Sequence, residues 1–148
     1  MIFSFVKTSP AQNTTVLVTS YCPQNLYSHV AEKAMSHEYL HAEQVGFIVP
    51  PANKGSLIGI EMAGGEFCGN ASRSFGLFLA GSGLSRRKDL ALIRVSGAEG
   101  LLEVRTDPDT GEARIKMPPV MGIEAVETDQ YGRVPLVVME GISHLILM

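Results

Sequence analysis

The sequence predicts a single α+β domain over residues 1–148, with mostly antiparallel strands around one or two helices. Short β-branched and apolar runs alternate with turn residues along most of the chain. Apolar residues follow helical spacing in two places, and no repeat, linker or low-complexity segment divides the sequence. With 148 residues and 45% hydrophobic content, the chain can bury one substantial core.

The first half of the chain contains four strand patterns and one helix pattern. The strand patterns cover residues 2–7, 14–19, 45–49 and 57–62. Asn25 is a favourable helix-capping residue, and apolar residues at helical spacing follow it. We therefore expect a helix from Asn25 to about His41.

The second half begins with a helix pattern after Cys68 and continues with strand patterns. Gly81 or Gly83 suits the left-handed residue that commonly follows a helix, so we expect the helix to end there. Residues 118–133 are less periodic, which predicts an outward loop. The strand patterns cover residues 90–95, 101–105, 113–117, 134–139 and 144–147.

A glycine-rich run, residues 64–74, surrounds Cys68 where a strand pattern changes to a helix pattern. Glycines allow a tight turn and a close approach of the backbone to a ligand. The free N–H groups and the dipole at a helix start favour negative charge, so we expect the thiol pKa to fall toward neutrality or below. The same N–H groups would hold a carboxylate or an oxyanion.

Composition and charge argue against several classes of protein. The net charge is −3, and the short run Arg86-Arg87-Lys88 is too small for a nucleic-acid surface. No apolar run approaches the ~20 residues of a membrane helix. Two cysteines, Cys22 and Cys68, are too few for a disulfide scaffold, so we expect a cytoplasmic protein with free thiols.

The run Glu66-Phe67-Cys68-Gly69-Asn70-Ala71-Ser72-Arg73 resembles the first catalytic-cysteine motif of the diaminopimelate epimerase-like family of racemases and epimerases. Weaker similarity extends to the loop that contains Asn13, the strand that contains Gln44, and residues 138–144. The resemblance implies a fold of two similar halves. This chain resembles the first half, in which strands curl around a central helix.

The resemblance also implies a two-base reaction on an amino acid, without pyridoxal phosphate, a metal or another cofactor. One thiolate removes the α-proton, and a second thiol protonates the opposite face of the same carbon. Cys68 would be one of the two catalytic sulfurs. Asn13, Gln44, Gly69 and Asn70 would bind the substrate, with the amides of Gly69 and Asn70 holding its α-carboxylate.

The second catalytic-cysteine motif of the family does not occur in this sequence. Cys22 precedes Pro23 and lacks flanking glycines, so it is a poor substitute. The chain also ends on an apolar run, residues 145–148, which predicts an unpaired strand edge. We therefore expect either a fragment without its second half or two copies that pair their Cys68 thiols, and we expect the isolated chain to be inactive.

Two positions differ from the diaminopimelate epimerases. Met62 and Ile142 stand where those enzymes use asparagines for the distal end of the substrate. The loss of two amide groups removes hydrogen bonds worth ~1–3 kcal/mol each to a buried charged group. The pattern therefore predicts a substrate with a different side chain, apolar or an imidazole, and it is similar to the pattern of histidine racemases.

Three alternatives remain open. The run His37-Glu38-Tyr39-Leu40-His41 matches the H-E-x-x-H zinc motif, which needs a helix through both histidines and would use Glu61 as a further ligand. Phenazine-biosynthesis isomerase-like proteins share the fold, and in that interpretation Glu43 is the base and Cys68 is a passive thiol. The third alternative is a non-enzymatic half-domain that binds a partner through its open edge.

Overall fold

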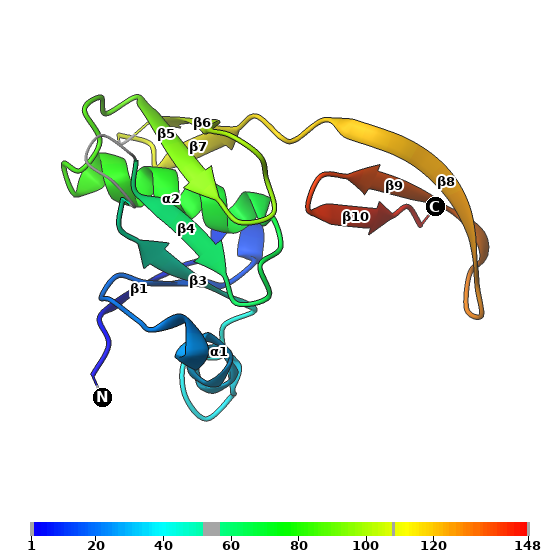
Figure 1. The fold of residues 1–148 in the computed structure, drawn as a ribbon, viewed down its shortest axis with the longest axis horizontal. Helices are drawn as coiled ribbons and strands as arrows, with labels where there is room; N and C mark the ends of the chain where they lie inside the picture. Colours follow the sequence, from blue (N-terminus) through cyan, green and yellow to red (C-terminus); the bar gives the residue numbers. More distant parts are fainter. Residues whose placement is uncertain (1, 52–56, 108, 148) are drawn as a thin grey trace.

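The computed structural model of the chain describes residues 2–51, 57–107 and 109–147. Its largest element is a seven-stranded sheet in the order β1-β2-β3-β4-β5-β6-β7, which curls around one long helix (Figure 1). The strands are β1 (Phe5–Thr8), β2 (Thr15–Val18), β3 (Gln44–Val49), β4 (Gly59–Met62), β5 (Leu90–Val95), β6 (Leu102–Asp107) and β7 (Glu112–Ile115).

Most neighbouring strands of this sheet are antiparallel, and the pairs β2–β3 and β4–β5 are parallel. Parallel neighbours need a long crossover connection. Helix α1 (Tyr27–Met35) lies in the first crossover and helix α2 (Gly69–Gly81) lies in the second. The predicted α+β class, with mostly antiparallel strands curled around a central helix, is confirmed.

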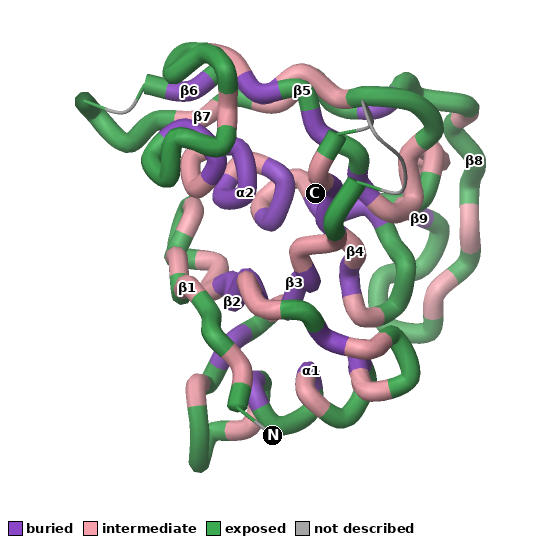
Figure 2. The backbone as a smooth tube through the Cα atoms, turned by 60° about the vertical axis from the view of Figure 1, so that its left-hand side comes forward, coloured by how far each residue is buried: buried purple, intermediate pink, exposed green. Residues whose placement is uncertain are grey.

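Helix α2 fills the inside of the curled sheet and contacts β2, β3, β5, β6 and β7. Its buried residues recur at helical spacing and include Phe75 and Leu79, which pack in one cluster with Leu17, Ile60 and Ile93. Figure 2 shows buried residues concentrated along α2 and on the strands around it. The predicted end of this helix near Gly81 or Gly83 is confirmed, because α2 ends at Gly81.

Helix α1 covers the outer side of β3 and forms a second cluster there. The ring of Tyr27 stacks on the ring of Phe47, with a centroid distance of 3.8 Å and an interplanar angle of 4°. Cys22 is buried in the same cluster. The prediction that this helix begins at Asn25 is wrong, since a 3-10 turn at Gln24–Leu26 precedes α1.

The prediction that α1 continues to about His41 is also wrong. The helix ends at Met35, and Ser36 takes an extended ψ of 140° that breaks the helical path. Its N–H still donates to the carbonyl oxygens of Glu32 and Lys33, which closes the last turn. Further along, His41 has a φ of 47°, which a continuous helix would not contain.

A second sheet, in the order β10-β9-β8, extends away from the first sheet (Figure 1). Its strands are β8 (Val120–Thr128), β9 (Gly132–Met139) and β10 (Ile142–Leu145). The predicted loop over residues 118–133 is therefore wrong. Pairing with β9 makes this segment a strand: Ile123 lies opposite Val137, and Val126 lies opposite Val134. Such cross-strand pairs stabilise a strand whose own periodicity is weak.

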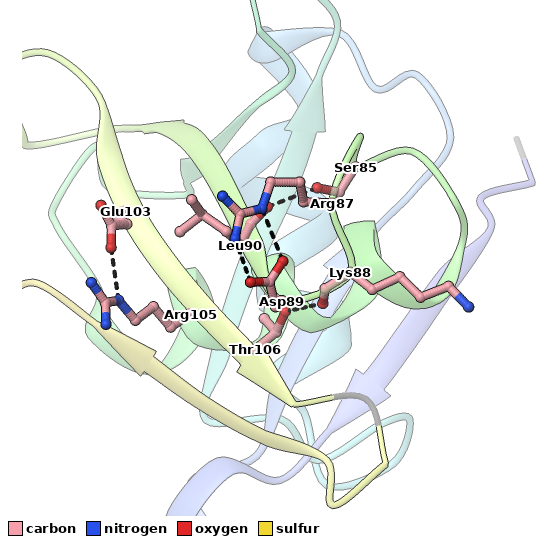
Figure 3. A network of polar contacts seen from close by, with 8 residues as sticks. All are labelled: Ser85, Arg87, Lys88, Asp89, Leu90, Glu103, Arg105 and Thr106. Atoms are coloured by element: carbon pink, nitrogen blue, oxygen red, sulfur yellow. Dashed lines mark hydrogen bonds and ion pairs between the residues drawn. The ribbon is translucent and has the colours of Figure 1, made fainter.

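A polar network holds the turn that leads from α2 into β5 (Figure 3). The guanidinium of Arg87 donates from Nε to Asp89 over 3.0 Å, and the hydroxyl of Ser85 donates to the carbonyl oxygen of Leu90 over 3.0 Å. Thr106, on β6, donates to the carbonyl oxygen of Lys88. Arg87 and Asp89 are exposed, so their ion pair adds little to the free energy of unfolding.

None of the helices in the described residues combines the length and the apolar character that crossing a membrane requires.

Candidate active site around Cys68

Cys68 is the N-cap residue of α2, in the position predicted from the glycine-rich run. It has an extended backbone, with φ −133° and ψ 111°, and α2 begins at the next residue. The N–H of Ala71 donates to the sulfur over 3.3 Å, as in a side-chain cap. The N–H and the hydroxyl of Ser72 both donate to the Cys68 carbonyl oxygen, over 3.0 and 2.7 Å. The sulfur is therefore held over the first turn of the helix.

A pocket of about 570 Å³ opens beside this sulfur. Cys68 is 8% exposed, so the thiol forms part of the pocket wall and is otherwise covered. The wall comes from β3, from the start of α2, from β7 with the residues after it, and from β10. The lining residues are Gln44, Glu66, Phe67, Cys68, Gly69, Asn70, Arg73, Ala113, Arg114, Ile115, Met117, Ile142 and His144.

Close backbone contact brings β10 to the pocket. The N–H of Phe67 donates to the carbonyl oxygen of Gly141 over 3.2 Å. A Cβ atom at Gly141 would lie 1.8 Å from the carbonyl oxygen of Gly97, and the φ of Gly141 is +71°. Glycine is therefore required at this position, and it places Ile142 and His144 at the pocket wall.

Four of the five predicted site residues line the pocket: Gln44, Cys68, Gly69 and Asn70. Cys68 donates from its sulfur to Oε1 of Gln44. Asn13 is not among the lining residues, but its Oδ1 accepts from Nδ2 of Asn70 over 3.1 Å. Asn13 therefore contacts a pocket residue, Asn70, but is not itself part of the pocket wall.

The predicted fall in the thiol pKa is wrong for this structure. Burial raises the pKa of Cys68, because a covered thiolate loses its hydration. The N–H groups of Ala71 and Asn70 act in the opposite direction but do not outweigh burial. The negative charge of Glu66 raises the pKa further, while the positive charge of Arg73 lowers it. The helix start was visible in the sequence, but its desolvation was not.

The two substitutions relative to diaminopimelate epimerases have different surroundings. Ile142 lines the Cys68 pocket. Met62 does not line it, and this residue is 2% exposed in the core packed against α2. Met62 therefore acts as core filler in the described chain.

Several pocket residues were not predicted from the sequence. Glu66 and Arg73 lie within the cysteine motif, so their proximity to the thiol was a signal that could have identified them. Arg114 and Met117 lie more than forty positions along the chain and had no such signal. Only the pairing of β7 with β6 brings them to the start of α2.

The zinc and phenazine-type alternatives do not fit the geometry. The rings of His37 and His41 lie 3.7 Å apart, but the segment is not helical, and no group of three or more potential ligands occurs in the described part of the chain. Glu61 lies on β4 opposite Phe47. The carboxylate of Glu43 accepts from the N–H of Thr14 over 2.6 Å, and Glu43 does not line the Cys68 pocket.

The chain is similar to histidine racemases along almost its whole length. The family model for the histidine racemase CntK N-terminal domain matches residues 2–148. A histidine racemase of Fusobacterium nucleatum is 36% identical over an alignment of 154 residues including gaps, and this alignment covers 98% of this chain and 54% of that protein. A histidine racemase of Staphylococcus aureus is 34% identical over 103 residues, which cover 69% of this chain and 37% of that protein.

The fold also matches a solved structure. A crystal structure of a probable proline racemase from Agrobacterium radiobacter, with bound carbonate, superposes with a TM-score of 0.66 at 12% identity, over 97% of this chain and 51% of that one. The chain spans about half the length of the Fusobacterium relative, with 54% of it covered. From the family match and these identities, the chain belongs to the histidine racemase family and corresponds to its N-terminal domain.

Proposed function

We propose that this chain is the first catalytic half of a cofactor-independent amino-acid racemase whose substrate is histidine. One observation carries the proposal: the Cys68 sulfur caps α2, and Cys68 borders a pocket together with Gly69 and Asn70, the first residues of that helix. The names of the Fusobacterium and Staphylococcus relatives support histidine as the substrate.

The start of α2 suits the α-carboxylate of an amino acid. Gly69 and Asn70 occupy the first turn, where N–H groups have no partner within the helix. Those N–H groups and the helix dipole favour an anion beside the pocket. A carboxylate held there would place Cα near the Cys68 sulfur. The negative charge that develops when Cα loses its proton would be stabilised by the same donors.

The reaction would use two sulfurs on opposite faces of Cα. A thiolate on one face takes the α-proton, and the electron pair of the broken C–H bond stays on the substrate as a carbanion. A thiol on the other face gives its proton to this carbanion, which forms the opposite enantiomer and a new thiolate. No net oxidation or reduction occurs, and proton exchange between the sulfurs and water resets the pair.

Cys68 suits the protonating role in the conformation described here. Its sulfur donates to Oε1 of Gln44, which requires the protonated thiol. The raised pKa of Cys68 also keeps the proton on the sulfur near neutral pH. In the reverse direction the same sulfur would act as the base, after its proton has passed to the substrate.

The second sulfur must come from outside this chain. Cys22 is 6% exposed and packs beneath α1 in the second cluster, with Tyr27 and Phe47, so it does not face the Cys68 pocket. Relatives about twice as long as this chain support a missing second half as the source. A second copy of this chain, with its own Cys68, is the other candidate.

The side-chain end of the pocket combines apolar and charged groups. Ile142 and Met117 provide apolar surface, while Glu66 and His144 provide a carboxylate and an imidazole. An imidazole side chain has an apolar face and two polar nitrogens, so it matches such a mixed wall. This composition supports histidine over diaminopimelate, whose distal end carries both an ammonium and a carboxylate.

The test is exchange of the α-proton of L-histidine for deuterium in heavy water. The exchange is measured as the loss of the Hα signal in proton NMR. We expect exchange and racemisation with the protein that carries both halves, and loss of both in Cys68→Ala. The 148-residue chain alone should show neither. Exchange by the chain alone would overturn the need for a second half. If the two-half protein also fails to exchange histidine, proline and diaminopimelate, the chain is a binding half-domain and not a racemase.

A further inference from the structure

Arg73 is the one basic residue on the first two turns of α2, and its side chain reaches back to the helix start. We infer that Arg73 is a positioning residue of the proposed site, which orients the carboxamides of Asn70 and Asn13 so that Asn13 offers a donor to the substrate carboxylate. This inference rests on the proposed function. It adds two roles to that function: a fixed direction for both amides, and a cation beside the anion site.

Three side chains form a short chain of hydrogen bonds at the start of α2. The guanidinium of Arg73 donates to Oδ1 of Asn70, one turn earlier on the same helix. Nδ2 of Asn70 then donates to Oδ1 of Asn13 over 3.1 Å. Asn13 precedes β2, 57 positions earlier in the sequence, so the chain of bonds joins the helix start to the sheet.

Arginine sets the direction of this chain because its guanidinium has donors and no acceptor. Only the oxygen of the Asn70 carboxamide can face Arg73, so the Asn70 nitrogen must face Asn13. The Asn13 oxygen must then accept, which leaves Nδ2 of Asn13 as the free end of the chain. No hydrogen bond from that Nδ2 to another residue occurs within residues 2–51, 57–107 and 109–147. Asn13 is half-buried, so this nitrogen can donate to water or to an acceptor-only carboxylate.

Arg73 also lacks an acidic partner in the part of the chain that the structure describes. The ion pairs found there involve Arg87, Arg105 and Arg114, each with a carboxylate on its own turn or strand. Arg73 is half-buried and borders both the Cys68 pocket and the neighbouring groove between β1 and β7. A half-buried guanidinium without a counter-ion favours an anion nearby.

The loop that carries Asn13 is held in place without Arg73. The hydroxyl of Thr8, on β1, donates to the hydroxyl of Ser74 on α2 over 2.9 Å. The N–H of Asn13 donates to the carbonyl oxygen of Pro10 over 3.0 Å. Replacement of Arg73 should therefore release the two carboxamides without detaching the loop from α2.

The test uses two reagents of similar size that attack the same thiolate, iodoacetate with a carboxylate and iodoacetamide without one. Rates of Cys68 alkylation are measured in the 148-residue chain with Cys22→Ser, and N-acetylcysteine amide serves as the reference thiol. The quantity compared is the iodoacetate rate divided by the iodoacetamide rate. This ratio cancels any change in the thiolate fraction, because both reagents need the same thiolate. We expect the wild-type ratio to exceed the reference ratio about five-fold, from the amides, the dipole and Arg73 together.

Two variants separate positioning from charge. Arg73→Met removes the donor and the charge, whereas Asn13→Ala removes the free amide and keeps the charge of Arg73. Both should lower the ratio about two-fold from the wild-type value, because the backbone N–H groups and the dipole of α2 remain, and the double variant should lower it no further than Arg73→Met does, since the two residues act through one amide chain. Thermal unfolding by circular dichroism checks that each variant folds, and Arg73→Leu replaces Arg73→Met if that variant does not.

The outcomes distinguish the inference from the proposed function. A wild-type ratio no higher than the reference ratio would show that the start of α2 does not attract a carboxylate, and the proposed function and the inference would fail together. A raised wild-type ratio that Arg73→Met leaves unchanged overturns the role of Arg73 alone. A ratio that Arg73→Met lowers and Asn13→Ala does not would show that charge acts without positioning, which also overturns the inference.

Discussion

The sulfur of Cys68, at the start of α2, donates to Oε1 of Gln44, at the start of β3. The two residues are separated by 24 positions in the sequence and meet because α2 lies inside the curled sheet. A carboxamide suits this position for a physical reason. Its oxygen accepts from a thiol, and after a rotation of the amide its nitrogen donates to a thiolate. Gln44 can therefore stabilise both protonation states that the proposed two-base reaction needs.

Replacement of Gln44 by glutamate should suppress the thiolate. A carboxylate next to the sulfur adds a like charge, which raises the pKa of Cys68 beyond the effect of burial. We expect Gln44→Glu to slow alkylation of Cys68 by iodoacetamide at pH 8 about ten-fold, which corresponds to one pKa unit. Gln44→Met is the neutral control of similar size and should slow it less. Equal rates in Gln44→Glu and the wild type would contradict the contact.

The pH dependence of Cys68 reactivity should follow burial and not the helix dipole. Burial raises the pKa of the thiol, so the thiolate forms only at a pH above the range of free cysteine, which has a pKa of about 8.5. In Cys22→Ser protein, the rate of iodoacetamide modification from pH 6 to 11 should reach half its maximum above that value. A midpoint at or below the value for free cysteine would mean that the amides of α2 outweigh desolvation.

Tyr27 should make the fold sensitive to alkaline pH. Burial and the neighbouring carboxylate of Glu61 raise the pKa of Tyr27 to about 12. The folded state thus keeps the neutral phenol while the unfolded chain ionises near pH 10, so this stabilisation is complete below about pH 10 and is lost as the pH rises toward 12. The expected loss in the free energy of unfolding is about 1 kcal/mol by pH 11.

Urea unfolding at pH 9 and pH 11 measures this loss, and Tyr27→Phe is the control. The phenylalanine variant keeps the ring that stacks on Phe47 but has no ionisable group. Its free energy of unfolding should fall less between the two pH values than that of the wild type. An equal fall in both proteins would assign the alkaline sensitivity to other groups.

Gly76 should resist replacement although it lies inside a helix. A Cβ atom there would lie 2.5 Å from Cγ1 of Val104 and 2.8 Å from its Cβ. Alanine gains ~1 kcal/mol in helix propensity, but overpacking a core costs ~1–3 kcal/mol, so we expect Gly76→Ala to destabilise the fold by about 1 kcal/mol. At Gly81 a Cβ meets nothing within 4 Å, so Gly81→Ala should be neutral or stabilising. Urea unfolding that shows Gly76→Ala as stable as Gly81→Ala would contradict the close packing of α2 on β6.

Patterns along the chain predicted elements where local geometry decides them. The glycines on both sides of Cys68 predicted a tight turn into a helix, and α2 begins at Gly69. Alternation and β-branched residues predicted β5, β6 and β9 to within a few residues. The same reasoning failed for β8, because its strand depends on pairing with β9 and not on its own sequence. It failed at the end of α1 because the helical pattern continues past Ser36 while the backbone does not.

The sequence by itself determined that a cysteine would stand at the opening turn of a helix, since tight turns and helix caps depend on a few neighbouring residues. Only the tertiary structure decided how acidic that cysteine is and what surrounds it. Strand β3 brings Gln44 to the sulfur, while β7 and β10 bring Arg114 and His144 to the pocket. Desolvation and pocket shape arise from atoms on strands far apart in the chain, and a reading of neighbouring residues cannot add up their effects.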